Sequence, residues 1–152
     1  LSRIISHFGF GLLILSISLN QIFSVEKTFN AKLGDEKIFQ NYIIKFNNLE
    51  TFSKNNFKSV TGKFEVIDTK KTRSQFLSPE IRVYNQPETI TYEASINSRI
   101  FSDTYLTMSN ISNSDIFNIK FQKKPFMNFI WFSVLLISLG GIFQFLRFST
   151  KT

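Results

Sequence analysis

Two apolar stretches without a charged side chain, one near each end, restrict the possible folds of this chain more than any other feature. They are residues 4–23 and residues 125–146. About 20 apolar residues in a helix cross the roughly 30 Å hydrocarbon core of a bilayer. The core helix of a soluble protein does not fit the second stretch, because the stretch is long and has no amphipathic pattern. The sequence therefore predicts two transmembrane helices, with both chain ends on one side.

A signal peptide is the alternative explanation for the first stretch. We disfavour it because the stretch contains His7 and no small-residue cleavage site precedes Val25. The second stretch is bounded by Lys124 and Arg147, and Pro125 suits the start of a helix. Trp131 fits a position near a membrane interface, where aromatic residues gather.

The segment between the two stretches has the pattern of a β domain. Apolar and polar residues alternate in four short runs, which are 42–46, 62–67, 80–84 and 116–121. Turn signals separate these runs, at Asn47-Asn48, Asn55-Asn56, Ser78-Pro79 and residues 110–115. Alternation with a period of two and regular turn signals predicts antiparallel strands. The expected fold class is membrane α plus all-β, with two transmembrane helices flanking an antiparallel β-barrel or sandwich-like extramembrane domain.

The expected division is a transmembrane helix at 1–24, the β domain at 25–124, a second transmembrane helix at 125–147 and a short cytoplasmic-side tail at 148–152. The charges do not by themselves fix the side of the β domain, because the positive-inside rule is reliable only for loops shorter than about 60 residues.

Composition excludes several classes of function. The net charge is +7, but the lysines are scattered, and nucleic-acid binding needs a coherent basic stripe. The absence of cysteine excludes disulfides, thiol chemistry and cysteine-ligated metals. The sequence also contains no GxSxG, Walker or HExxH motif. We therefore expect no nucleic-acid partner and no free-standing catalytic residues.

His7 is the only histidine, and it lies inside the first apolar stretch. An ionisable residue within a membrane is a functional hypothesis by default. On a helix His7, Gly11, Ile14 and Ser18 form one stripe, and Gly9 and Gly11 remove bulk close to the imidazole, as a flat porphyrin requires. The alternative is a histidine that hydrogen-bonds to a neighbouring helix, with the glycines serving close packing. The two methionines, Met108 and Met127, are unconvincing second ligands.

A second candidate site lies in the run that begins at Pro79. In a strand, Glu80, Arg82 and Tyr84 share one face. A carboxylate, a guanidinium and a phenol in a row can bind a partner peptide or a haem propionate. A solvated face with local pairing is the alternative.

A series of short motifs runs in order along nearly the whole chain. They are SHFGFGLLIL from Ser6, Gly34-Asp35, Tyr42-Ile43-Ile44-Lys45-Phe46, Pro79-Glu80-Ile81-Arg82-Val83-Tyr84, Glu93-Ala94, Asp103-Thr104-Tyr105, Lys124-Pro125-Phe126, and Trp131 before Gly140-Gly141. No single motif is decisive, but the ordered series closely resembles the C-terminal part of the CcmF family, the haem lyase subunits of cytochrome c maturation, and their NrfE-type relatives.

The resemblance implies a cofactor and partners. Proteins of this family attach haem to the CxxCH thiols of apocytochrome c, receive haem from the chaperone CcmE, and work with CcmH and CcmI. They also carry a transmembrane haem b held by two histidines, and His7 matches the second of these. By the same resemblance the β domain is periplasmic, in the bacterial inner membrane; the mitochondrial inner membrane is the alternative.

The resemblance also implies that other machinery of the family lies upstream of this chain, including the tryptophan-rich haem-handling segment and the first haem histidine. We therefore expect a C-terminal fragment or one polypeptide of a split protein, which is not catalytic alone. His7 precedes Phe23 by 16 residues, about 24 Å along a helix. That depth suits a haem that reduces incoming haem iron, and does not suit one that touches a substrate held by the β domain.

Two other functions are retained as alternatives. A membrane-anchored β-domain scaffold would bind maturation or assembly partners without a cofactor. A channel or transporter subunit is disfavoured, because the apolar stretches carry few polar residues besides His7, Asn20, Gln21 and Gln144.

Overall fold

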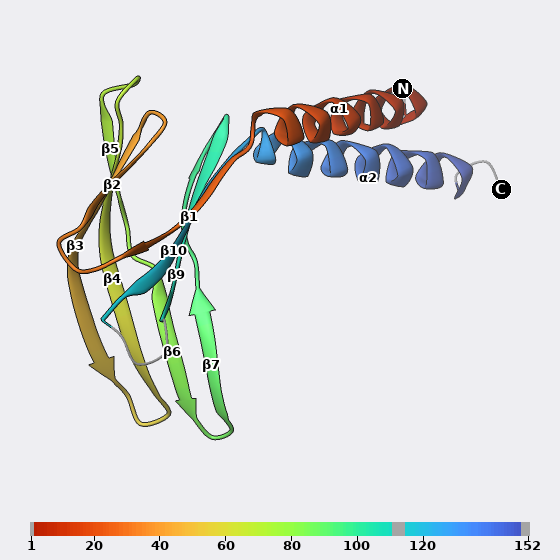
Figure 1. The fold of residues 1–152 in the computed structure, drawn as a ribbon. Coiled ribbons are helices and arrows are strands. Elements are labelled where there is room, and N and C mark those ends of the chain that lie inside the picture. Colours follow the sequence, from red (N-terminus) through yellow and green to blue (C-terminus); the bar gives the residue numbers. More distant parts are fainter. Residues whose placement is uncertain (1, 111–114, 150–152) are drawn as a thin grey trace. The chain divides into compact units, whose positions relative to one another are not determined.

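The computed structural model describes residues 2–110 and 115–149 of the chain. These residues form a helix near each end, with ten strands between them (Figure 1). They divide into two compact units. One unit contains both helices and the segment Ser98–Asp103, and the other consists of Glu26–Asn97 and Thr104–Gln122. The expected tail at 148–152 falls largely outside this description, because residues 150–152 are not described and α2 ends at Ser149.

The helical unit is built from α1 (Ser2–Phe23) and α2 (Met127–Ser149). By length and composition both helices can cross a membrane, and only 17% and 11% of their most apolar segments are buried. The core helix of a soluble protein would be mostly buried instead. Helical structure suits these segments, since a helix satisfies every internal backbone hydrogen bond without water.

Small side chains bring α1 and α2 together side by side and antiparallel (Figure 1). The buried residues of α1 are Ser2, Gly9 and Ser16, which recur every seven residues and so lie on one face. From α2, Gly140 packs directly against the first turns of α1. The Ser2 hydroxyl donates to Gln144 Oε1 of α2 at 2.6 Å, and at the other end of α1 the Asn20 side-chain amide donates to the carbonyl of Pro125, two residues before α2, at 2.5 Å.

The β domain contains two sheets in the described residues. The first has the order β1-β10-β9-β8, and the second has the antiparallel order β2-β3-β4-β6-β7 with β5 added to β4. The strands are β1 (Val25–Ala31), β2 (Glu36–Phe39), β3 (Tyr42–Ser53), β4 (Phe57–Asp68), β5 (Arg73–Leu77), β6 (Glu80–Asn85), β7 (Glu88–Glu93), β8 (Ser95–Arg99), β9 (Ser102–Asn110) and β10 (Phe117–Pro125).

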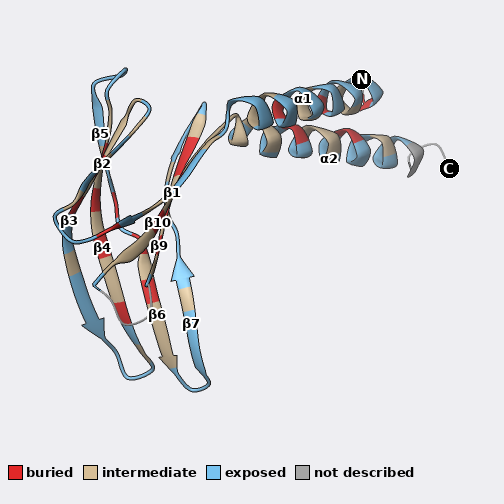
Figure 2. Cartoon of the chain, viewed as in Figure 1, coloured by how far each residue is buried: buried red, intermediate tan, exposed pale blue. Residues whose placement is uncertain are grey.

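The core of this domain comes from both sheets, as in a sandwich (Figure 2). Buried positions alternate along the strands, with pairs such as Ile44 and Phe46 on β3 and Phe64 and Val66 on β4. The rings of Phe46 and Phe64 stack with their centroids 4.3 Å apart. The other sheet contributes Ala31, Leu106, Met108, Ile119 and Phe121. This burial confirms the predicted antiparallel β domain, and the four predicted runs lie within β3, β4, β6 and, from Phe117, β10.

The start of α2 differs from the expectation. Pro125 is the last residue of β10, and the helix begins at Met127 after Phe126, whose φ is +61°. The Phe126 amide donates to the carbonyl of Phe101 at 2.9 Å, and its own carbonyl accepts from the Ile130 amide at 3.3 Å. Phe126 is therefore the turn residue that joins β10 to the first turn of α2. A proline is compatible with a helix start, but it suits a strand end equally well.

We expect Gly140→Ala to destabilise the helix pair. A Cβ atom at this position would lie 2.1 Å from Ser6 Oγ and 2.9 Å from the backbone atoms Ser2 O and Ser6 N, and the backbone cannot rotate away. Overpacking of this kind costs about 1–3 kcal/mol. The midpoint of thermal unfolding of the detergent-solubilised protein should therefore fall.

Gly141→Ala is the matched control, because a Cβ atom there would meet nothing within 4 Å. Alanine is the better helix former by about 1 kcal/mol. The control should leave the midpoint unchanged or raise it, and equal losses in both variants would contradict the packing described here.

Candidate functional site

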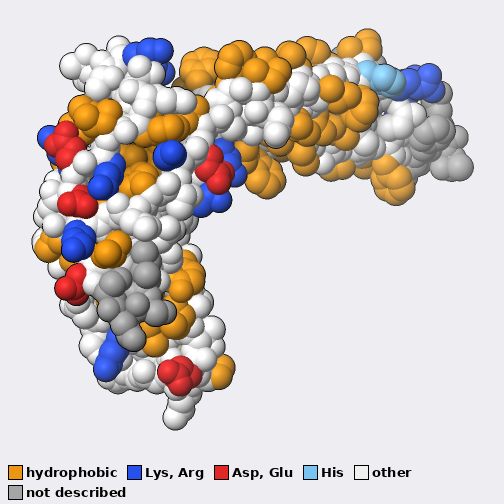
Figure 3. Space-filling model, viewed as in Figure 1, with side chains coloured by type: hydrophobic (Ala, Val, Ile, Leu, Met, Phe, Trp, Pro, Cys, Tyr) orange, Lys and Arg blue, Asp and Glu red, His pale blue; other side chains and the backbone are white. Residues whose placement is uncertain are grey.

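The only histidine of the chain lies on an exposed face of α1, pale blue in Figure 3. His7, Gly11, Ile14 and Ser18 are all exposed and follow one another at helical spacing, so the predicted stripe exists and faces away from α2. The neighbouring side chains on this surface are apolar and exposed, including Phe8 and Phe10. An exposed imidazole on an apolar helix face requires a partner outside this chain if the helix lies in a bilayer.

The ring of His7 is oriented by its own helix. Nδ1 lies 2.7 Å from the carbonyl oxygen of Arg3, one turn earlier. A carbonyl oxygen only accepts hydrogen bonds, so Nδ1 carries the proton and the lone pair is on Nε2. Histidines that bind metals commonly use this arrangement, in which the second ring nitrogen donates to a carbonyl or carboxylate. The imidazole is therefore held in a tautomer that can ligate a metal through Nε2.

The two glycines next to His7 have different roles. A Cβ atom on Gly9 would lie 3.0 Å from Ile137 Cγ1 and 3.0 Å from Leu136 Cβ, so Gly9 serves close packing against α2. A Cβ atom on Gly11 would meet nothing within 4 Å. Of the two glycines expected to clear space beside the imidazole, only Gly11 lies on the open face. Gly9 instead agrees with the alternative interpretation, in which the glycines serve close packing between helices.

The described residues supply no second ligand for a metal at His7. They include no group of three or more His, Cys, Asp or Glu that could hold a metal ion. Met108 is fully buried in the β core. Met127 begins α2 ten residues before Ile137, which packs against Gly9, and ten residues of helix span about 15 Å. A metal held by His7 therefore needs a further ligand from elsewhere.

The second candidate site lies on β6. Its side chains Glu80, Arg82 and Tyr84 share one face, as the alternation predicted, while Ile81 is buried in the core. Arg82 Nη2 donates to Glu80 Oε2 at 2.9 Å. The predicted residues are thus brought together, and the pairing among them matches the local-pairing alternative.

A neighbouring turn adds residues that the sequence did not single out. Phe57 is paired in register with Tyr84, and their ring centroids are 5.5 Å apart. The guanidinium carbon of Arg82 lies 5.4 Å from the centre of the Phe57 ring, and Lys54 Nζ lies 5.9 Å from it. We call Lys54, Phe57, Glu80, Arg82 and Tyr84 the aromatic–cationic cluster. Such contacts contribute about 0.5–1 kcal/mol each at exposed sites.

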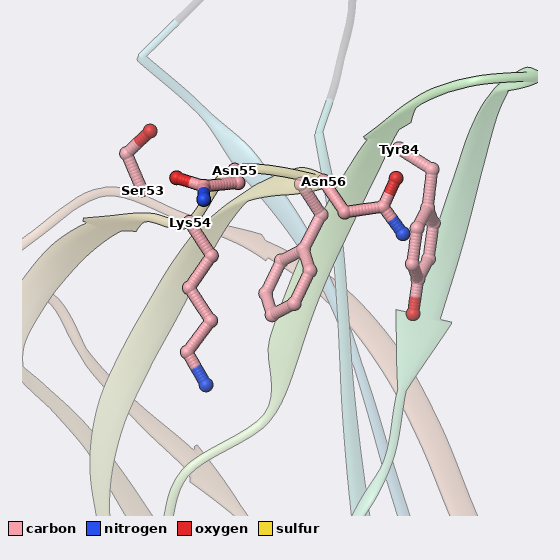
Figure 4. Close-up of a pocket in the computed structure, with 6 residues that line it drawn as sticks. Ser53, Lys54, Asn55, Asn56 and Tyr84 are labelled. Atoms are coloured by element: carbon pink, nitrogen blue, oxygen red, sulfur yellow. The ribbon is translucent and has the colours of Figure 1, made fainter.

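A shallow hollow of about 490 Å³ lies at this cluster, lined by residues 53–57 and Tyr84. In Figure 4 the Lys54 side chain and the Tyr84 ring lie on opposite sides of it, below the turn residues Asn55 and Asn56. The sequence signal that could have drawn attention to Phe57 is the Asn55-Asn56 pair, because asparagine pairs favour turns. This turn leads into β4, the strand on which Phe57 pairs with β6.

The charges of the cluster depend on one another. The hydrogen bond from Arg82 holds the pKa of Glu80 below its usual value, a hydrogen bond from Ser59 acts in the same direction, and partial burial opposes both. Hydrogen bonds with Glu80 and Tyr84 raise the pKa of Arg82. The Nε of Arg82 is buried without a hydrogen-bond partner among the described residues. The cluster therefore keeps a charged pair with one donor unused.

Comparison with known proteins finds similarity between this chain and cytochrome c biogenesis proteins. A family model described as the CcmF C-terminal beta-sandwich matches residues 22–125. The chain is 30% identical over 136 residues to the cytochrome c-type biogenesis protein ccl1 of Rhodobacter capsulatus, and 26% identical over 137 residues to CcmF of Escherichia coli. These alignments cover 90% of this chain and 21% of each relative, so the chain spans about a fifth of their length.

A solved structure named cytochrome c haem lyase CcmF has the same fold. The TM-score is 0.66 at 14% identity, and the alignment covers 93% of this chain and 23% of that one. The likeness thus includes helical as well as β residues.

We expect the stability of the β domain to fall in acid through Glu80. Because its pKa is lowered in the folded state, its contribution is complete above the unfolded-state pKa and is lost as the pH falls through the folded-state value. Denaturant unfolding followed by circular dichroism, at neutral pH and below pH 4, measures this. Glu80→Gln should lower the midpoint at neutral pH and show a smaller acid-dependent loss. An identical acid-dependent loss in the variant would contradict the assignment.

Proposed function

The chain belongs to the CcmF C-terminal β-sandwich family, and from this premise we propose that it is the C-terminal part of a CcmF-type cytochrome c haem lyase. In this proposal His7 supplies one axial ligand to a transmembrane haem b, and the chain is not catalytic alone. The observation that carries the proposal is the exposed imidazole of His7, whose Nδ1 donates a hydrogen bond to the Arg3 carbonyl. This hydrogen bond leaves Nε2 available to ligate iron.

The residues present fit one side of a haem site. His7 offers a nitrogen ligand, Gly11 leaves open space one turn later, and the exposed phenylalanines of α1 offer an apolar surface. A haem bound there would supply one-electron redox chemistry. The contribution of this chain is to hold the imidazole in the ligating tautomer and to keep bulk away from it. The second axial ligand belongs to the upstream part of the same protein.

The proposed site lies in the bilayer, on the leaflet farther from the β domain. His7 precedes the end of α1 at Phe23 by 16 residues, about 24 Å of helix. We place the β domain on the periplasmic side of the bacterial inner membrane, with the mitochondrial inner membrane as the alternative. At that depth His7 can support reduction of incoming haem iron but cannot contact an apocytochrome at the β domain.

The proposed partners follow from family membership. They are the upstream part of the same protein, a CcmE-like haem chaperone, CcmH-like and CcmI-like subunits, and apocytochrome c. The E. coli relative is named for cytochrome c-type biogenesis, which supports this assignment.

Replacing His7 tests the ligand. We expect His7→Ala to abolish the reduced low-spin b-type absorption of the complex formed by this chain and its upstream part, because this chain has no second histidine to replace the imidazole. Holocytochrome c formation should fall with it. Purified complex with an unchanged haem content would refute the role of His7.

Replacing Gly11 tests the space beside the ligand. A leucine at Gly11 would project from the open face next to His7, so we expect Gly11→Leu to lower the haem content several-fold with the protein still assembled. Ser18→Leu, two turns farther along the same exposed stripe, is the matched control and should retain haem. Equal haem content in both variants would show that Gly11 is not beside the porphyrin.

A cofactor-free scaffold is the second candidate, and the aromatic–cationic cluster favours it. The rings of Phe57 and Tyr84 line a hollow together with Lys54, and Arg82 keeps one unused buried donor among the described residues. This function predicts that Phe57→Ala disrupts co-purification of partner subunits, whereas His7→Ala leaves both assembly and holocytochrome c formation unchanged. A loss of haem and of product in His7→Ala would exclude it.

A further inference from the structure

Two large apolar side chains are exposed together at the turn between β8 and β9. The exposed fractions are 71% for Ile100 and 64% for Phe101. Hairpin turns are usually polar, because they face water. Neighbouring apolar side chains at such a position mark a contact surface.

This turn is fixed to the start of α2. The Phe126 amide donates to the carbonyl of Phe101 at 2.9 Å, and the Asn128 side-chain amide donates to the carbonyl of Arg99 at 2.7 Å. The ring of Phe101 also packs near that of Phe129, with centroids 5.8 Å apart. The turn and both helices belong to one compact unit. Its position relative to the first turn of α2 is therefore determined.

The first turn of α2 marks a boundary between polar and apolar chain. The charge-free stretch begins just after Lys124, and the helix then exposes apolar side chains such as Trp131, at 65%. If α2 crosses a bilayer, its first turn lies where hydrocarbon gives way to headgroups, the depth at which aromatic residues gather. The attached turn lies at the same depth.

Charge also favours lipid as the occupant. Arg99, Lys123 and Lys124 lie within the same unit at this end of α2. Basic residues beside apolar side chains bind the boundary between anionic headgroups and acyl chains. A protein partner would have to cover a surface that continues directly into the exposed apolar face of α2.

We propose that the β8–β9 turn is a membrane-interface anchor, in which Ile100 and Phe101 insert into the headgroup–acyl boundary of the bilayer that α2 crosses. The proposal rests on α2 being a membrane span, which the proposed function also requires. It adds a membrane contact made by the turn between two strands, separate from the two helices.

The test is lipid-dependent fluorescence quenching in the full protein that contains this chain, reconstituted in nanodiscs with anionic lipid. This chain has no cysteine, so Ile100→Cys gives one labelling site in it; cysteines elsewhere in the protein are replaced. An environment-sensitive label at residue 100 should be quenched at least two-fold more by shallow nitroxide lipid than by aqueous iodide.

Trp131→Cys separates failure of this inference from failure of the membrane span. If the label at residue 131 is quenched by lipid and the label at residue 100 only by iodide, the turn faces water and the anchor is refuted. Shielding of residue 100 from both quenchers would show that protein covers it, which also refutes the proposal. Absence of lipid quenching at residue 131 would remove the span and the anchor together. Phe101→Cys provides a second labelling position should Ile100→Cys fail to assemble.

Discussion

Close packing between small residues of α1 and α2 is the constraint on which the helical unit depends. Gly140 leaves no room for even a methyl group against Ser2 and Ser6, and Gly9 is similarly tight against Leu136 and Ile137. In a bilayer the hydrophobic effect does not drive helices together, because lipid tails are as apolar as the side chains. Close packing and interhelical hydrogen bonds hold the pair together instead. This seam fixes the rotation of α1 about its axis, and so decides that His7 and Gly11 face outward.

The β domain follows a different physical rule, because its core is dry and supplied by both sheets. Alternation sends Ile81 inward and Glu80, Arg82 and Tyr84 outward on the same strand. Burial of the apolar set forms the core, while the outward set makes its own hydrogen bonds and ring contacts at the surface. Because the apolar and polar side chains of β6 lie on opposite faces, the aromatic–cationic cluster forms on the outer face of the sheet, beside the turn after β3.

Much of the architecture was predictable from local patterns. The two charge-free stretches and four alternating runs led to the two helices and to strands β3, β4, β6 and β10. Strands β2, β5 and β8 were missed because they are short, and β1, β7 and β9 were not singled out either. Pro125 was misleading, since a proline is tolerated at a helix start and at a strand end alike. For the sites, His7 and the β6 residues could be selected from the sequence, whereas Lys54 and Phe57 became relevant only through strand pairing.

The sequence by itself determined the two helical stretches and four of the strands, that one histidine lies in an apolar helix, and which residues share a face of β6. These properties depend on residues a few positions apart, and local periodicity fixes them. Only the tertiary structure decided that Gly9 packs while Gly11 stays open, that Phe57 meets Arg82, and that Ile100 and Phe101 lie at the first turn of α2. Each of these depends on contacts between residues distant in the chain, whose partners local periodicity does not specify.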